Sequence, residues 1–297
     1  MASQHYFMIC YKPMAKTTKH TASEKILGIL NSTHLPPCLA VTAISALMAY
    51  FSGVRSGIFL VVPTVLLGQF SVGWCNDYLD RKDDILAKRI EKPLVSGIVK
   101  AETIKNLSLV SLFISIVLSF LYSVPAGIVY SVAMASAFLY NFRLKNSPFS
   151  IVTYMVSFGL LPVFIALGNP RPFIPAYWMI LASGLLGAGV HFQNVIPDFE
   201  VDKIAGIKGL PHYFSYQHAL LLGSVFLVLS ALCIGLGIGG LGSVTSRLVL
   251  GSFAAVAILF SVLYFTKQID KAYKSALLLS FLGTLVMISG APFMRVI

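Results

Sequence analysis

The chain has 297 residues, of which 57% are hydrophobic and only 11% charged, and its formal net charge is +11. Its mean hydropathy is +0.83. A soluble domain of this length needs far more polar surface than this composition offers, so that class is excluded. The composition indicates an integral, multi-pass membrane protein.

The first part of the chain is polar and basic, and it lacks the apolar stretch of a cleavable signal peptide. We therefore expect a cytosolic N-terminal segment over residues 1–33 and one membrane domain over residues 34–297. That domain holds nine windows of about 20 apolar residues, the length that crosses a bilayer as a helix. The predicted fold is an all-α, polytopic membrane helical bundle with about nine transmembrane helices and a cytosolic N-terminus. The windows lie at 36–53, 56–75, 104–123, 124–141, 149–168, 173–194, 217–240, 246–266 and 273–293.

The charges are distributed very unevenly across this topology. With the N-terminus inside, 18 of the 22 Lys and Arg residues and all eleven acidic residues fall on the cytosolic side. The other four basic residues are Arg55, Arg171, Arg247 and Arg295. Because cytosolic loops of membrane proteins carry an excess of Lys and Arg, this bias supports the orientation. The net positive charge therefore reflects topology, and we expect no nucleic-acid partner.

Two long polar loops, 76–103 and 195–216, follow the second and the sixth predicted helix. They lie four helices apart, which suggests two related four-helix halves and a ninth helix. Each half would carry one polar loop at the cytosolic end of its second helix.

Most of the acidic residues lie in these two loops. Residues 76–84 and 198–202 together hold seven of the eleven. If the second helix continues through residue 86, Asn76, Asp80 and Asp84 recur at every fourth residue and share one face, with Asp77 beside them. Asp198 and Asp202 have the same spacing.

Carboxylates at this density repel one another unless a cation neutralises them. Two such ladders facing each other could hold Mg²⁺, which takes hard oxygen ligands and shares them with substrate phosphates. The alternative is that both loops carry only solvated surface ion pairs. Their shared placement and spacing favour a metal site.

Further residues extend this pattern. The first acidic segment is followed by Lys88-Arg89 and by Lys92-Pro93-Leu94 with Gly97. The fourth predicted helix leads into the segment Tyr140 to Lys145. The second acidic segment, Asp198-x-x-x-Asp202, is followed by Gly206. Together with Asn76-Asp77-x-x-Asp80-x-x-x-Asp84, these stretches resemble the UbiA superfamily of intramembrane prenyltransferases. The resemblance covers essentially the whole chain.

The resemblance implies a cytosol-facing cavity in which Mg²⁺ bridges the diphosphate of a prenyl donor. The implied partners are a prenyl diphosphate, an aromatic, quinone-precursor-like or lipid-like acceptor, and membrane lipid. The implied metal and diphosphate ligands are Asn76, Asp77, Asp80, Asp84, Asp198 and Asp202, of which Asp77, Asp80, Asp198 and Asp202 would be catalytic. Lys88, Arg89, Arg143 and Lys145 would hold diphosphate oxygens, and Tyr140, His191 and Asn194 are candidates for the acceptor pocket.

Two positions depart from the family's pattern. Where many members carry an Arg-Pro pair before the first helix, this chain has Thr33-His34-Leu35-Pro36-Pro37. Lys92 stands where Arg is usual, which keeps the charge but loses the bidentate fork.

His191 lies three residues before Asn194, and a lone histidine there is more often a core residue than a catalytic base.

Two other functions stay open at this point. A terpene cyclase would ionise the same prenyl diphosphate and close the carbocation on itself without an acceptor. An ion-coupled transporter is more remote, because transporters place ionisable residues near the middle of the membrane and the spans predicted here carry almost no acid.

Overall fold

The protein is an assembly of long helices, seen in a computed structural model that describes residues 20–55, 57–204, 206–238 and 244–290. Each of the nine apolar windows coincides with one long helix of the described chain. These helices are α2 (Leu35–Phe51), α3 (Ile58–Leu86), α4 (Ala101–Tyr122), α5 (Val124–Phe142), α6 (Ser150–Leu167), α7 (Tyr177–Val195), α9 (Tyr216–Gly237), α10 (Val244–Phe265) and α11 (Ile269–Gly290). The short elements are α1 (Ala22–Asn31), α8 (Phe199–Ile204) and the 3₁₀ turns η1 (Leu144–Asn146), η2 (Ile196–Asp198) and η3 (Leu210–Tyr213).

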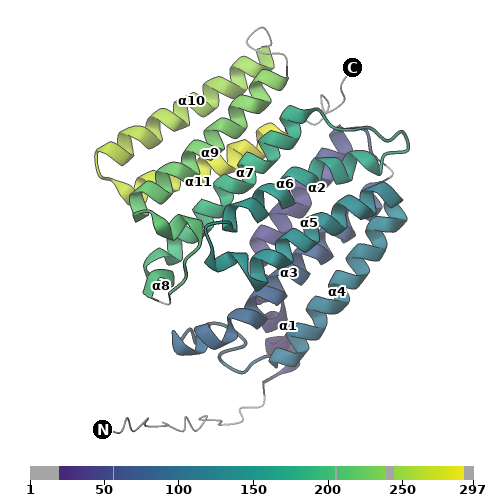
Figure 1. Ribbon diagram of the computed structural model, residues 1–297, viewed down its shortest axis with the longest axis vertical. Helices are drawn as coiled ribbons and strands as arrows, with labels where there is room; N and C mark the ends of the chain where they lie inside the picture. The colour runs from purple at the N-terminus through teal and green to yellow at the C-terminus, as the bar shows by residue number, and fades with distance from the viewer. Residues whose placement is uncertain (1–19, 56, 205, 239–243, 291–297) are drawn as a thin grey trace, which may run out of the picture.

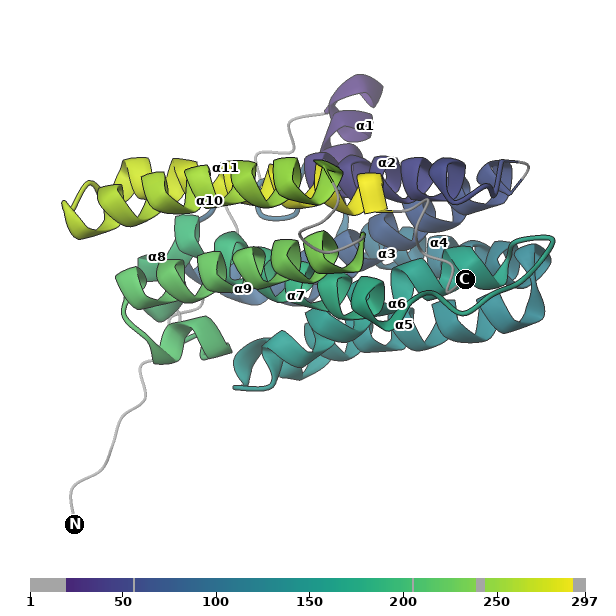
Figure 2. The same ribbon diagram turned by 90° about the horizontal axis from the view of Figure 1, so that it is seen from above.

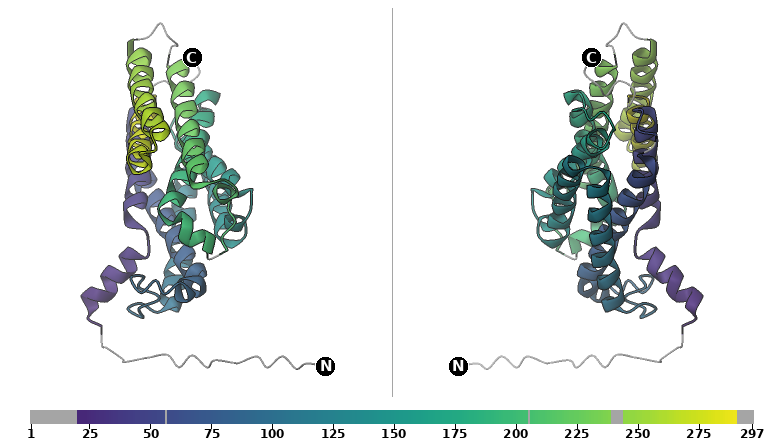
Figure 3. Two further views of the ribbon diagram at one scale, coloured as in Figure 1. Left: turned by 90° about the vertical axis from the view of Figure 1, so that its left-hand side faces the viewer. Right: turned by 90° about the vertical axis from the view of Figure 1, so that its right-hand side faces the viewer.

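Among the described residues, six helices are by length and composition apolar enough to cross a membrane on their own. They are α3, α4, α5, α6, α7 with the turn that follows it, and α9. A seventh span results if α1 and α2, which meet at 61°, are counted together. Figures 2 and 3 show α1 turning away from the rest of the bundle. The chain is therefore an all-helical, multi-pass membrane bundle, as the sequence predicted.

Most helix pairs that pack extensively are neighbours in sequence. The largest interfaces join α3 to α4, α7 to α9, α6 to α7 and α5 to α6. At the α3–α4 interface, Ser71 and Ser108 each donate a hydrogen bond to the other's carbonyl oxygen at 2.8 Å. Between α4 and α5, Ser123 caps α5 by accepting a hydrogen bond from the Ala126 N–H, which stabilises the tight turn between the two helices.

One glycine determines how the chain enters the bundle. A Cβ atom added to Gly73 of α3 would stand 2.3 Å from the carbonyl oxygen of Thr33. A side chain at this position would collide with Thr33. Because glycine has none, the turn between α1 and α2 lies directly against α3. The indole N–H of Trp74 fixes the same crossing by donating to the Ile29 carbonyl at 2.9 Å. This contact places His34, the N-cap of α2, beside the end of α3 that carries the first acidic motif.

Candidate active site

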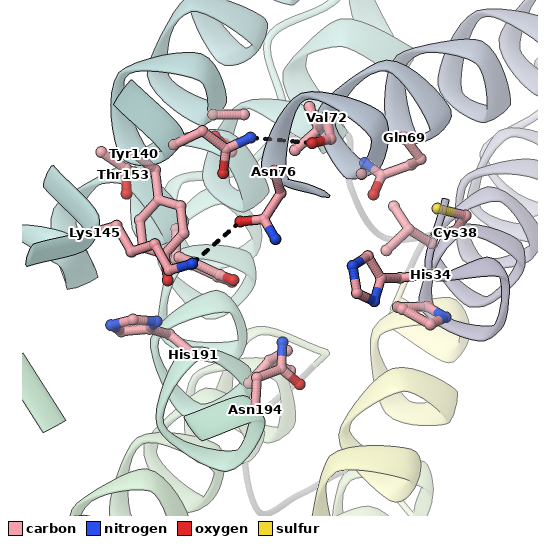
Figure 4. Close-up of a pocket in the computed structure, with 18 of the residues that line it drawn as sticks. His34, Cys38, Gln69, Val72, Asn76, Tyr140, Lys145, Thr153, His191 and Asn194 are labelled. Carbon is pink, nitrogen blue, oxygen red and sulfur yellow. Dashed lines mark hydrogen bonds between the residues drawn. The ribbon is translucent and has the colours of Figure 1, made fainter. Parts of the chain in front are cut away.

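A cavity of about 570 Å³ opens between α2, α3, α5, α6 and α7. Figure 4 shows side chains from several of these helices turned toward one shared space. Both acidic motifs reach it, and so do three basic side chains that follow them or lie near them in space. The charged or amide residues that line the cavity are Gln69, Asn76, Asp80, Asp83, Asp84, Arg89, Lys92, Asn141, Lys145, Asn194, Asp198 and Asp202.

The first motif lies on one unbroken helix. Because α3 continues to Leu86, Asn76, Asp80 and Asp84 share the face that lines the cavity. Asp77 points elsewhere and is only 3% exposed. Its Oδ1 atom lies 3.0 Å from Lys92 Nζ and 3.2 Å from His34 Nε2.

Two basic residues after α3 connect the carboxylates. Lys92 Nζ lies 2.9 Å from Asp84 Oδ2 as well as beside Asp77. Arg89 contacts Asp84 Oδ1 at 3.5 Å and Asp198 Oδ2 at 3.1 Å, so it joins the first motif to the second. Burial lowers the pKa of Lys92 and of Arg89, but the neighbouring carboxylates outweigh it and hold both pKa values above their ordinary range.

The second motif lies where a helix breaks. α7 ends at Val195, and Pro197 stands at the start of η2. The following α8 ends before Gly206, whose φ of +79° is the left-handed conformation that glycine adopts readily. The Ile207 N–H donates to the Asp202 carbonyl at 2.9 Å and closes this turn. Both Asp198 and Asp202 consequently line the cavity.

The basic residues assigned to the diphosphate from the sequence occupy different environments. Lys145, in η1, is paired with Asp80 and lies 3.5 Å from Asn76 Oδ1. Arg89 and Lys145 line the cavity. Lys88 and Arg143 are exposed and are not among its lining residues, so their role at the diphosphate stays a prediction that this geometry does not support.

An aromatic wall completes the other side of the cavity. The ring centroids of Tyr140 and Tyr154 are 5.1 Å apart, and that of His191 is 4.5 Å from Tyr154. His191 is 1% exposed, and its Nε2 atom lies 2.9 Å from Ser150 Oγ. Figure 4 shows Tyr140, Lys145, Thr153 and His191 on one side of the cavity and His34 on the other.

Several contacts of this site carried no clear sequence signal. The sequence places Lys92 in the segment after the first motif, but it does not indicate the ion pairs of Lys92 with Asp77 and Asp84. His212 belongs to no pattern in the sequence, yet its Nε2 atom lies 3.4 Å from Asp202 Oδ2. Pairing across the fold decides both contacts, so residue spacing could not reveal them.

The carboxylate and amide oxygens of this wall are the hard ligands that Mg²⁺ prefers. In the described ranges, no three His, Cys, Asp or Glu side chains converge closely enough to form a metal cage by themselves. Asp80, Asp84, Asp198 and Asp202 are instead each paired with a basic side chain. Mg²⁺ takes few protein ligands where substrate phosphates supply the others, so this donor set fits a metal that binds together with a diphosphate.

Comparison with known proteins agrees with this geometry. The UbiA prenyltransferase family matches residues 35–285. The digeranylgeranylglyceryl phosphate synthase of Pyrococcus furiosus is 24% identical over 78% of this chain and 84% of its own length. The 4-hydroxybenzoate octaprenyltransferase of Salmonella paratyphi B is 29% identical over 56% of this chain and 59% of its own length. A solved structure of a UbiA homologue from Archaeoglobus fulgidus, bound to GPP and Mg²⁺, shares the fold with a TM-score of 0.64 at 16% identity, over 88% of this chain and 99% of that one.

Proposed function

The chain belongs to the UbiA prenyltransferase family and is a prenyltransferase, and we propose that it transfers an isoprenyl group from a prenyl diphosphate to an aromatic or lipid-like acceptor in an Mg²⁺-dependent reaction. One observation carries this proposal. Two acidic motifs and the cations Arg89, Lys92 and Lys145 meet on one cavity inside an apolar helical bundle.

The polar end of the cavity suits the diphosphate. The oxygen atoms of Asn76, Asp80, Asp84, Asp198 and Asp202 fit Mg²⁺, which when bound with the donor supplies positive charge that stabilises the leaving group. Arg89, Lys92 and Lys145 are already held beside these carboxylates. They can therefore turn to the phosphate oxygens over a short distance and form charge-assisted hydrogen bonds with them.

The remaining wall suits the isoprenyl chain and the acceptor. Tyr130, Met134, Phe158, Leu161 and Phe164 form an apolar and aromatic surface in the same cavity. Such a surface keeps water away from an allylic carbocation, and its ring faces stabilise positive charge.

The acceptor is proposed to approach along the wall formed by Tyr140, His191 and Asn194. When the C–O bond of the donor breaks, its electron pair leaves with the diphosphate. The acceptor then forms the new bond to the allylic carbon and releases a proton. The names of the two relatives described above suggest a lipid phosphate or an aromatic acid as the acceptor.

We propose that this site faces the cytosol, because the acidic motifs lie on the side that carries 18 of the 22 basic residues. Lys82, Glu200 and Arg171 are exposed positions at which single cysteines can report the orientation. In a cysteine-free background, an impermeant maleimide added to intact cells should label Arg171→Cys alone. Labelling of Lys82→Cys or Glu200→Cys from outside would overturn the orientation.

The function is tested by incubating purified protein and Mg²⁺ with prenyl diphosphates of several chain lengths. Each donor is supplied alone, with hydroxylated aromatic acceptors, or with a glyceryl phosphate lipid. Mass spectrometry should find a prenylated acceptor, together with released diphosphate. A cyclised hydrocarbon or alcohol formed without acceptor would identify a cyclase, and no consumption of any donor would contradict the proposal.

A further inference from the structure

Residues 206–212, which follow α8, lie beside residues of both acidic motifs' surroundings. His212 contacts Asp202 of the second motif, and Gly209 lies against the backbone of Lys145, which pairs with Asp80 of the first motif. α8 has only six residues. A helix this short is not stable by itself, so the position of Asp202 within it needs support from outside. Residues 206–212 turn back from α8 and supply that support.

His212 holds the second acidic motif. Its side chain is 4% exposed, and its Nε2 atom lies 3.4 Å from Asp202 Oδ2. The ring stacks on Phe199 with centroids 5.2 Å apart and planes at 24°. Phe199 is itself 1% exposed and packs edge-on against Tyr216. These contacts hold the imidazole ring in place, so that its Nε2 atom stays within ion-pairing distance of Asp202 Oδ2, although the two atoms are not aligned as a hydrogen bond.

Gly209 brings the same segment against η1, which carries Lys145. A Cβ atom at Gly209 would stand 2.8 Å from the Lys145 carbonyl oxygen and 3.5 Å from Ser150 Oγ. The backbone of Gly209 has φ −64° and ψ 160°, which any residue can adopt. Space, rather than backbone conformation, is therefore what requires glycine. The next residue, Leu210, donates its N–H to Ser150 Oγ at 2.9 Å, and Ser150 in turn contacts His191.

We propose that residues 206–212 form a positioning strap that couples the two acidic motifs. His212 aims the carboxylate of Asp202 into the cavity. Gly209 lets the strap lie against the backbone of Lys145, whose ammonium group stays beside Asp80 of the first motif. This inference rests on the proposed function, and it makes His212 and Gly209 positioning residues that act through Asp202 and Lys145.

The first test measures metal affinity directly. Mn²⁺ binding to the full chain is followed by electron paramagnetic resonance in the presence of a prenyl thiolodiphosphate, a donor analogue that does not ionise. His212→Ala should weaken Mn²⁺ binding about tenfold or more, the usual effect of losing a group that orients a metal ligand. His212→Gln, whose amide nitrogen can reach the position of Nε2, should recover most of this loss. His218→Ala is the matched control, because the side chain of His218 is exposed and bonds the nearby Ser215.

The second test uses the space at Gly209. Gly209→Ala should lower the affinity for the thiolodiphosphate about tenfold at saturating Mn²⁺, the scale of one lost charge-assisted bond. Gly251→Ala is the matched control, because a Cβ atom there meets nothing within 4 Å.

The outcomes separate the strap from the function on which it rests. Wild-type Mn²⁺ affinity in His212→Ala, or equal losses in His212→Ala and His212→Gln, would overturn the role of His212 as an orienting group. Wild-type donor affinity in Gly209→Ala would overturn the coupling to Lys145. A wild-type protein that binds neither Mn²⁺ nor the analogue would instead overturn the proposed function.

Discussion

The two acidic motifs perform one proposed task from two different kinds of backbone. The first lies on the regular helix α3, and its Asp77 is 3% exposed and paired with Lys92 and His34. The second spans a break between α7 and α8, and its Asp198 side chain is 47% exposed and paired with Arg89. Asp77 is thus fixed partly by burial, whereas Asp198 depends more on its contact with Arg89 from the segment after α3.

The comparison shows that lying within an acidic motif does not by itself bring a carboxylate into the cavity. On a helix, the residue that follows Asn76 is rotated by about 100°. Asp77 is therefore turned away from the cavity and toward Lys92, while Asp80 and Asp84 stay on the face of Asn76. In the second motif, the break at Pro197 is followed by helical residues, so Asp198 and Asp202 still reach the same cavity.

The largest expected effect is shared by both motifs. Asp80→Ala and Asp198→Ala should each lower the rate of diphosphate release on the order of 100-fold or more, because each removes a carboxylate proposed to hold Mg²⁺ at the leaving group. The measurement is a single-turnover assay with saturating donor and Mg²⁺. If one motif's variant keeps near wild-type rates while the other loses activity, only that other motif serves the metal.

Stability should distinguish the motifs. Asp77→Ala removes a buried carboxylate that pairs with Lys92 and His34 and leaves Asp84 as the carboxylate partner of Lys92. Losing a buried hydrogen bond to a charged group costs about 2 kcal/mol. Asp198→Ala removes a half-exposed ion pair, which contributes less than about 1 kcal/mol. Thermal unfolding in detergent should therefore show a clear drop in melting temperature for Asp77→Ala and little change for Asp198→Ala. Equal melting temperatures for the two variants would contradict the expectation that the buried Asp77 contributes more to stability than the half-exposed Asp198.

A smaller effect is expected from the cations around the first motif. Lys145→Gln should lower kcat/KM for the donor about tenfold, since Lys145 lines the cavity beside Asp80. Arg143→Gln is its matched control, because Arg143 lies two residues earlier in the chain and is exposed outside the cavity. An equal loss of kcat/KM in both variants would indicate that Arg143 also binds the diphosphate. Wild-type kcat/KM in both variants would show that Lys145 does not bind it.

The parts of this account that follow from local sequence were predictable. The apolar windows predicted the long helices, and the adjoining windows 104–123 and 124–141 predicted the short α4–α5 connection. The four-residue spacing of Asn76, Asp80 and Asp84 predicted their shared face on α3. These features depend on hydropathy and on backbone preferences, which residues a few positions apart determine.

The pairing of charges was not predictable in the same way. Arg89 and Asp198 are 109 residues apart, and their contact depends on how the fold brings the segment after α3 beside η2. The role of His34 at Asp77 likewise needs the close approach of Thr33 to Gly73. The direction of Asp77 is an exception, because helical rotation alone separates it from Asn76, Asp80 and Asp84.

The central claim is that donor and metal bind together in the cavity between the two motifs. Calorimetric titration of a prenyl thiolodiphosphate into the purified protein tests it without any knowledge of the acceptor. We expect binding in Mg²⁺ that disappears in EDTA, returns when Mg²⁺ is restored, and is absent from the Asp80→Asn/Asp198→Asn double variant at any Mg²⁺ concentration. Equally tight binding in EDTA, or in the double variant, would contradict the account.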